Sequence, residues 1–193
     1  MFDSVDDVQG RFRDAKYIAN RRISTVVYLA ARMGRPVLIE GPAGVGKTEL
    51  AKVLSDFQVS VPELGTVRAK HIPLVVLTSN NARELSDGLK RRCLHLFIDF
   101  PAPADELQII RLKVPEIPEH LARAVVAAVQ KIRAMDLRKL PSVSESLDWA
   151  RSLVILSARE LNPELVESTL TMLVKHEKDL ERVKSSLDKV LAE

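Results

Sequence analysis

The sequence has few cysteine and aromatic residues and no long apolar run. It has one cysteine, Cys93, which excludes an internal disulfide and a multi-cysteine metal site. Aromatic residues make up 4% of the 193 residues and the net charge is only +3, which argues against nucleic acid as the main partner. No apolar run approaches the roughly 18 residues that a membrane-spanning helix needs.

The remaining composition is that of a globular protein. The acidic start "MFDSVDD" lacks the basic and apolar regions of a signal peptide, so we expect a cytoplasmic protein. The 46% of hydrophobic residues suffices for one domain with a core, or for a small domain with a helical annex. Cys93, within "RRCLHLFI", is interpreted as a buried apolar side chain rather than a nucleophile.

The short apolar run at 36–40 has no alternation, which predicts a parallel strand buried on both faces. Residues 73–79 predict a second buried strand, and residues 94–100 predict a third strand. Helical spacing marks residues 20–33, which end at Gly34, and residues 46–57 after the first strand. Between the helix at 46–57 and the second strand, residues 57–67 alternate between apolar and polar types around a Pro-Glu-Leu-Gly turn, which predicts a β-hairpin. A short helix at 83–93 carries its basic residues toward the C-terminal end.

The second half of the chain has a different character. Pro101 and Pro103 mark a boundary, so we expect one domain over 1–100 and another over 101–193. Four later segments have helical periodicity, and they predict an all-helical domain with Trp149 packed between helices. These segments are 104–114, 118–135, 144–156 and 162–191.

The pattern G-x-x-x-x-G-K-[ST] occurs between a predicted buried strand and a predicted helix. Glycines let backbone N–H groups curl around phosphate oxygens, Lys47 reaches the β and γ phosphates, and the Thr48 hydroxyl is a magnesium ligand. The alternative is a glycine turn with an incidental lysine. The pattern predicts binding of ATP and Mg²⁺ by a run of neighbouring residues: Gly41, Pro42, Ala43, Gly44, Val45, Gly46, Lys47, Thr48 and Glu49.

Residues 11 to about 105 resemble the MoxR-type branch of the AAA+ ATPases. The resemblance rests on "YIANRRISTVVYLAARMGRPVLIEGPAGVGKTELAKVL" and on "FQVSVPELGTVRAKHIPLVVLTSNNARELSDGLKRRCLHLFIDFPAP". It implies an α/β fold: a P-loop three-layer αβα core, reduced here to about three parallel strands, with a C-terminal all-helical lid domain. It also implies an ATP-driven chaperone that assembles enzyme complexes or inserts their metal cofactors, in an oligomeric ring, often beside a von Willebrand factor A-type partner.

The resemblance also implies roles for individual residues. Asn80 falls where the sensor 1 asparagine orients the attacking water. Arg91 and Arg92 fall where an arginine finger reaches a neighbouring subunit's nucleotide, and Arg92 is the better match. Tyr17 and Ile18 match the region that packs around adenine. Each role has a structural alternative: a turn cap for the asparagine, helix C-terminal charges for the arginines, and a core position for the tyrosine.

A sensor 2 arginine, which the family carries in its lid, has no clear counterpart. The matching region "SVSESLDWAR" holds Glu145 and Ser146 at the closest positions, and Arg151 is displaced. We therefore leave sensor 2 unassigned.

The family's magnesium-binding strand, which ends in Asp-Glu, is missing. The P-loop helix and the hairpin fill most of residues 46–69, and two further strands with their helices would need roughly fifty more residues. Asp99 ends "LHLFID" as such a strand would, but it coincides with the last strand before the lid. Glu40, Asp56 and Glu63 lack the required context.

Removal of two edge strands from the family's sheet order, 5-1-4-3-2, would leave three contiguous strands: 94–99, 36–40 and 73–79. The newly exposed edge of the sheet predicts that the chain has marginal stability or associates with other chains.

The sequence leaves three functional alternatives open. They are an ATP-driven chaperone, a non-hydrolysing subunit of a mixed ring in which Arg92 acts on a complete neighbour, and an inactive, internally deleted ATPase. A small kinase is disfavoured, because no acceptor-site chemistry is found.

Overall fold

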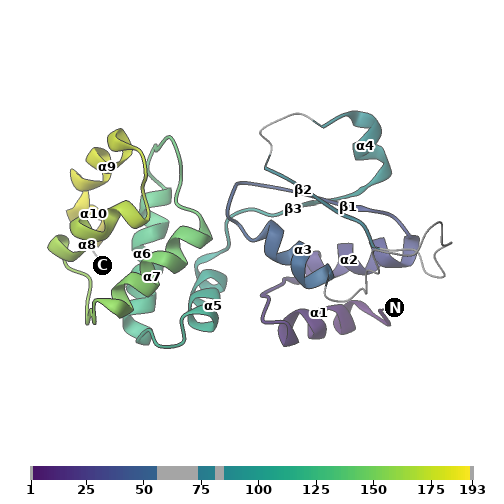
Figure 1. Cartoon of the computed structure of the whole chain (residues 1–193), viewed down its shortest axis with the longest axis horizontal. Helices are drawn as coiled ribbons and strands as arrows, with labels where there is room; N and C mark the ends of the chain where they lie inside the picture. Colours follow the sequence, from purple (N-terminus) through teal and green to yellow (C-terminus); the bar gives the residue numbers. More distant parts are fainter. Residues whose placement is uncertain (1, 56–73, 81–84, 192–193) are drawn as a thin grey trace, which may run out of the picture. The chain divides into compact units, whose positions relative to one another are not determined.

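A computed structural model describes residues 2–55, 74–80 and 85–191 of the chain (Figure 1). The chain divides into two compact units, Met1–Asp99 and Phe100–Glu193. We call them the P-loop unit and the helical unit, and each is described by itself. The predicted hairpin at 57–67, together with Asp56 and Glu63, lies outside the described residues.

The P-loop unit is built on a three-stranded parallel sheet. Its strands are β1 (Val37–Glu40), β2 (Val76–Ser79) and β3 (Leu94–Phe97), in the order β2-β1-β3. All residues of the central strand β1 are buried, which explains why its sequence is apolar without alternation. The predicted set of three contiguous parallel strands is confirmed, including the central place of residues 36–40. The predicted burial is wrong for β2, whose residues are half-buried or exposed, because β2 is an edge strand of the described sheet.

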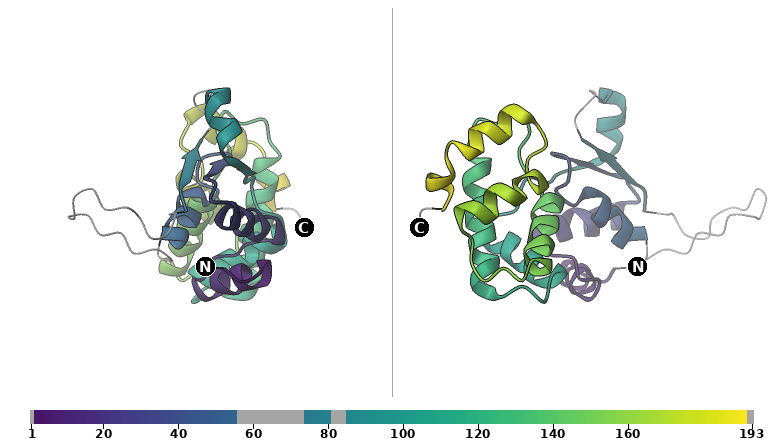
Figure 2. Two further views of the ribbon diagram at one scale, coloured as in Figure 1. Left: turned by 90° about the vertical axis from the view of Figure 1, so that its right-hand side faces the viewer. Right: turned by 60° about the vertical axis from the view of Figure 1, so that its left-hand side comes forward.

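The described residues of this unit include four helices beside the sheet. They are α1 (Val5–Asp14), α2 (Arg21–Met33), α3 (Lys47–Ser55) and α4 (Asp87–Arg92). Helices α2 and α3 lie on one side of the sheet, and α4 lies on the other side (Figures 1 and 2). Helix α2 packs against β1 and β3, and α3 packs against β2. The predicted α/β fold class is confirmed.

Helix α1 was not among the predicted elements. Its first turn is capped by Ser4, whose hydroxyl accepts a hydrogen bond from the Asp7 amide at 3.0 Å. Phe12 and Val8 of this helix are fully buried. Ser4, followed by the acidic residues of the first turn, was the available signal for the start of a helix.

The helical unit contains the rest of the described chain. Its elements are α5 (Pro103–Lys113), α6 (Glu119–Arg133), α7 (Val143–Ile155), α8 (Pro163–Thr169), a 3₁₀ turn (Leu170–Met172), α9 (Glu177–Lys184) and α10 (Leu187–Leu191). Trp149 is fully buried among these helices, and its indole N–H donates to the Thr169 hydroxyl at 2.8 Å. Cys93 of the other unit is also buried, so both predicted core positions are confirmed.

The periodic stretch 162–191 is not one continuous helix. It is interrupted between α8 and α9, and within α9 the buried carboxylate of Asp179 accepts hydrogen bonds from the backbone N–H groups of Arg138 and Lys139, at 3.0 and 3.3 Å. This contact fixes α9 against the loop that follows α6. Periodicity alone could not place that break.

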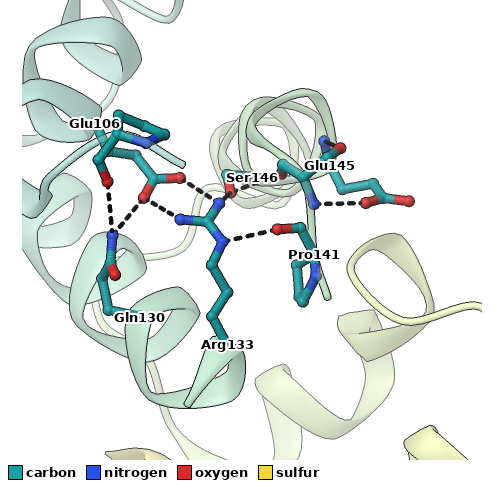
Figure 3. A network of polar contacts seen from close by, with 8 residues as sticks. Glu106, Gln130, Arg133, Pro141, Glu145 and Ser146 are labelled. Atoms are coloured by element: carbon teal, nitrogen blue, oxygen red, sulfur yellow. Dashed lines mark hydrogen bonds and ion pairs between the residues drawn. The ribbon is translucent and has the colours of Figure 1, made fainter. Parts of the chain in front are cut away.

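A buried polar network joins α5, α6 and α7 (Figure 3). The Arg133 guanidinium donates to both carboxylate oxygens of Glu106, at 2.6 and 2.8 Å, and to the Ser146 hydroxyl at 3.3 Å. Gln130 donates to the same carboxylate at 2.9 Å, and the guanidinium lies 4.7 Å from the centre of the Phe100 ring. Glu106 is fully buried, so these contacts replace the hydration that its charge has lost.

Among the described helices, none is long and apolar enough to cross a membrane.

Candidate functional site: a glycine loop at the carboxyl edge of the sheet

The loop from Gly41 to Gly46 connects the end of β1 with the start of α3. The backbone φ angles of Gly41, Gly44 and Gly46 are all positive, at 150°, 74° and 95°. At Gly46 an added Cβ atom would meet nothing closer than the Tyr17 hydroxyl at 4.0 Å, so the loop is open on this side. An open glycine loop that leads into a helix N-terminus is suited to an anion.

Gly41 is required for steric reasons. An added Cβ atom at this position would lie 1.9 Å from the backbone oxygen of Ile98, so any residue other than glycine would clash. The close approach is fixed by a hydrogen bond from the Ile98 amide to the Glu40 carbonyl, at 2.8 Å. The fold itself therefore requires glycine at position 41, whether or not the loop binds a ligand.

Lys47 is the first residue of α3, and it is buried at 7% exposure. Its ammonium group donates a hydrogen bond of 2.7 Å to the Gly41 carbonyl and a second hydrogen bond to the Pro42 carbonyl. Burial lowers the pKa of Lys47 below its ordinary value of 10.5. Because a phosphate oxygen is a stronger acceptor for an ammonium group than a carbonyl is, a bound phosphate would compete for Lys47.

The other loop residues differ in exposure. Val45 is buried and anchors the loop, whereas Ala43 and Thr48 are exposed. Glu49, in the first turn of α3, is half-buried. Thr48 therefore lies on the accessible side of the helix start.

Tyr17 lies beside this loop, is half-buried and packs against the buried Phe12. Its ring centre is 5.5 Å from that of Phe12, and its amide donates to the Phe12 carbonyl at 2.8 Å. Burial raises the pKa of Tyr17, and the negative charge of Glu49 raises it further. Ile18, the next residue, is half-buried. The partly buried side chain of Tyr17 thus packs against Phe12 and also lies at the edge of the loop.

Two further segments end at the same edge of the sheet as the loop. The last pair of β1 and β2 joins Glu40 to Ser79, so Asn80 follows at the level of Gly41. Asp99 follows Ile98, the residue that lies against Gly41. Asn80 and Asp99 are both exposed. In open parallel sheets, ligands bind at this carboxyl edge.

Arg91 and Arg92 do not join this group. They precede Leu94 of β3, which pairs with Val37 at the beginning of β1, while the loop follows the end of β1. At about 3.3 Å per residue, the two edges are roughly 10 Å apart along the strand. Both arginines are exposed, and the Arg92 guanidinium donates to the Gly88 carbonyl of its own helix at 3.0 Å. Any action on a nucleotide would therefore be directed away from the chain's own loop.

The carboxylate nearest to the loop in sequence is already engaged. The Glu40 side chain is 12% exposed, and its carboxylate lies 2.5 Å from Nε2 of His95 on β3. Within residues 2–55, 74–80 and 85–191, no group of three or more His, Cys, Asp and Glu side chains could hold a metal ion. An open glycine loop of this kind is suited to an anion such as phosphate, and the Thr48 hydroxyl would be its magnesium ligand.

The region matched to sensor 2 has local structural roles. Glu145 accepts a hydrogen bond from the Ser142 amide at 2.7 Å in a capping box at the start of α7. The Ser146 hydroxyl donates to the Ser142 carbonyl at 3.1 Å. Arg151 pairs with Asp148 on the same helix at 3.0 Å. These contacts explain the residues without a nucleotide.

Two residues with long-range contacts in this unit were not singled out by the sequence. His95 reaches Glu40 only because β3 lies beside β1, and the spacing of 55 residues gives no sign of it. Arg35 lies before β1, at the edge of the sheet opposite the loop, and contacts the carbonyl groups at the end of α4. A single sequence contains no signal for either contact.

The chain is similar to solved structures but matches no family model and no curated protein. Among solved structures, a mutant of RuvB from Thermotoga maritima aligns with a TM-score of 0.48 and 17% sequence identity. The alignment covers 86% of this chain and 71% of the RuvB chain.

Proposed function

We propose that the chain binds ATP through the loop 41–48, with Mg²⁺ held between the phosphates and the Thr48 hydroxyl. The observation that carries the proposal is the burial of the Lys47 ammonium within a glycine loop at a helix start. Lysine is almost never buried without a charged partner. The hydrogen bonds of Lys47 within the loop go to carbonyl groups, which a phosphate can replace.

The biological setting follows from the sequence. The order of the loop, Asn80, the pair Arg91 and Arg92, and a helical region resembles MoxR-type AAA+ proteins. On that basis we place the chain in a cytoplasmic, ring-forming assembly that promotes the assembly of an enzyme complex or the insertion of its metal cofactor. A von Willebrand factor A-type protein is the expected partner.

The residues of the chain support ATP binding better than they support ATP hydrolysis by the chain itself. Phosphoryl transfer depends on carboxylates that position the metal ion and water. Glu40 is held by His95, and the described residues contain no carboxylate cluster. These observations favour a non-hydrolysing subunit whose ring neighbours turn over ATP. Asp99 is the exposed carboxylate at the correct edge, and it is the residue to replace if turnover is found.

The test is to measure nucleotide binding and ATP turnover on the same purified sample. A fluorescent ATP analogue reports affinity, and thermal unfolding reports stabilisation by ATP and Mg²⁺. Ligand at 100 times its dissociation constant should stabilise the fold by about 2.7 kcal/mol. Lys47→Ala should abolish both signals, whereas Lys52→Ala, which removes an exposed lysine from the same helix, should preserve them.

The outcomes separate the alternatives. Binding that requires Lys47, without turnover, supports a non-hydrolysing subunit. Magnesium-dependent turnover that Asp99→Asn removes would make the chain an ATPase with a relocated carboxylate. An absence of nucleotide binding in the unaltered chain would refute the proposal and favour an inactive, internally deleted ATPase.

A further inference from the structure

One side of the three-stranded sheet is poorly covered. Residues that pair across a parallel sheet point to the same side of it, and successive residues of a strand point to opposite sides. Along β3, Leu96 is fully buried, whereas Phe97 is 37% exposed and the His95 side chain is 48% exposed. Helix α2 packs against β3. Leu96 therefore faces α2, and His95 and Phe97 face the side on which α4 lies (Figure 1).

The same alternation assigns residues of the other two strands to this side. We call it the α4 face, and its residues are Leu38 and Glu40 of β1, Leu77 and Ser79 of β2, His95 and Phe97 of β3, and Val75, which precedes β2. Of these residues, only the two from the central strand are buried. Val75 is 45% exposed, and its carbonyl accepts a hydrogen bond from the Val37 amide at 2.8 Å. The two outer strands thus leave apolar side chains exposed.

Helix α4 does not cover this face. None of its residues is buried, and Leu89 is its one half-buried residue. The end of the helix is held instead by Arg35, whose guanidinium donates to the carbonyls of Arg91 at 2.6 Å and Arg92 at 3.3 Å. In layered α/β folds, helices cover both sides of a parallel sheet. The described residues place two helices against the other side of the sheet, and only this short helix on the α4 face.

The α4 face is cationic at the edge where β1 begins. Lys90, Arg91 and Arg92 are exposed at the end of α4, and Arg35 lies just before β1. Among the described residues, none of these four side chains forms an ion pair with a carboxylate. The carbonyl contacts of Arg35 leave its charge uncompensated. Charges of one sign beside an apolar surface select a partner with the opposite charge.

The buried carboxylate in the centre of the face already has a partner. The Glu40 carboxylate lies 2.5 Å from Nε2 of His95 on the neighbouring strand. Burial of a charged group without a partner is costly, whereas a paired and hydrogen-bonded group can be covered at a smaller cost. A partner can therefore cover the centre of the α4 face without supplying a cation for Glu40.

We propose that the α4 face is a docking site for an amphipathic, acidic helix of a partner protein. Its apolar stripe packs on Val75, Leu77 and Phe97, and its acidic residues lie against the arginines and the lysine at the end of α4. A helix is favoured because helices are what cover sheet faces in this class of fold. The acidic character follows from charge complementarity. The inference is independent of the proposed nucleotide binding.

The probe is a fluorescein-labelled synthetic peptide of about 18 residues, which is long enough to form a helix. It carries leucine at helical spacing along one face, and glutamate and alanine elsewhere. One control peptide has lysine in place of glutamate, and another has the same composition without the helical spacing. Fluorescence anisotropy with the full chain measures each dissociation constant. The acidic amphipathic peptide should bind at least tenfold more tightly than either control, and its affinity should fall as salt is added.

Variants of the chain test whether the peptide binds at the α4 face. The double variant Val75→Thr, Phe97→Thr removes apolar surface but keeps residues that favour strands, and should weaken binding at least tenfold. The double variant Arg91→Gln, Arg92→Gln removes two charges from α4 and should weaken binding to a similar degree. Ile155→Thr removes an apolar side chain that is 81% exposed in the helical unit, and should bind the peptide as the unaltered chain does.

Several results would overturn the inference. They include an unaltered chain that does not bind the acidic peptide, equal binding of all three peptides, and unchanged binding in both double variants. Loss of a dimer in these variants, measured by sedimentation velocity, would assign the face to a second copy of the chain. Binding to vesicles of phosphatidylcholine and phosphatidylserine in place of the peptide would assign it to a membrane surface. If Val75→Thr, Phe97→Thr does not fold, the arginine variant and the lysine peptide decide the question.

Discussion

Both carboxylate oxygens of Glu106 accept hydrogen bonds from the guanidinium of Arg133, and the two side chains are 0% and 6% exposed. The pair joins α5 to α6 at the start of the helical unit (Figure 3). A buried ion pair is a weak source of net stability, but the removal of one partner leaves an uncompensated buried charge.

Replacement of Arg133 by methionine should therefore destabilise the helical unit by about 3–5 kcal/mol. The double variant Glu106→Leu, Arg133→Met should recover most of that loss, because no charge is then left without a partner. Urea unfolding followed by the fluorescence of Trp149, the only tryptophan, reports this unit. Additive losses in the two single variants and the double variant would contradict the coupling.

The two ends of the glycine loop should respond differently to alanine. Gly41→Ala should disrupt the P-loop unit, because the new Cβ atom would meet the Ile98 backbone. Gly46→Ala should cost only the strain of its positive φ angle, about 1–3 kcal/mol, and should mainly weaken nucleotide binding. Circular dichroism and nucleotide titration of both variants check this contrast, and equal destabilisation would contradict it.

Tyr17 provides a prediction for alkaline pH. Burial raises the pKa of Tyr17 in the folded chain above its ordinary value of 10. As the pH rises above 10, Tyr17 therefore loses its proton more readily in the unfolded chain than in the folded chain, and the folded chain loses stability. Spectrophotometric titration should show a tyrosine that ionises late, and Tyr17→Phe should remove that step and leave Tyr28. The variant should also lose less stability between neutral and alkaline pH. Identical titration curves would show that Tyr17 is not buried beside the loop.

The helical unit should fold by itself. Its core contains Ile110, Leu121, Val129, Trp149 and Leu170, all fully buried within residues 100–193. We expect a fragment of these residues to unfold cooperatively, with the same tryptophan emission maximum as the full chain. A fragment without a cooperative transition would show that the unit depends on the rest of the protein.

Features set by local sequence could be predicted. The strand before Gly41 and the helix from Lys47 follow from an apolar run and a glycine pattern. The place of β3 beside β1 was expected from the sheet order of the family that the chain resembles, and not from local sequence. Helix α2 ends at Gly34, as its left-handed backbone requires.

Contacts between distant residues could not be predicted. The bond between Glu40 and His95 depends on the register of β1 and β3, and the contact of α9 with the loop after α6 depends on Asp179 reaching that loop. Arg35 reaches α4 only when β3 has paired with β1. Such contacts connect parts of the chain whose separation in sequence contains no periodic pattern.

The close approach of Ile98 to Gly41 has a consequence for the evolution of this chain. Since the fold demands glycine at position 41, selection would retain it even in descendants that no longer use a nucleotide. Gly46 has no such close contact, because an added Cβ atom there would meet nothing closer than the Tyr17 hydroxyl at 4.0 Å, so only its positive φ angle disfavours a side chain. Among relatives, retention of Gly41 without Gly46 would mark a surviving fold, and joint retention of both would be expected where nucleotide binding survives.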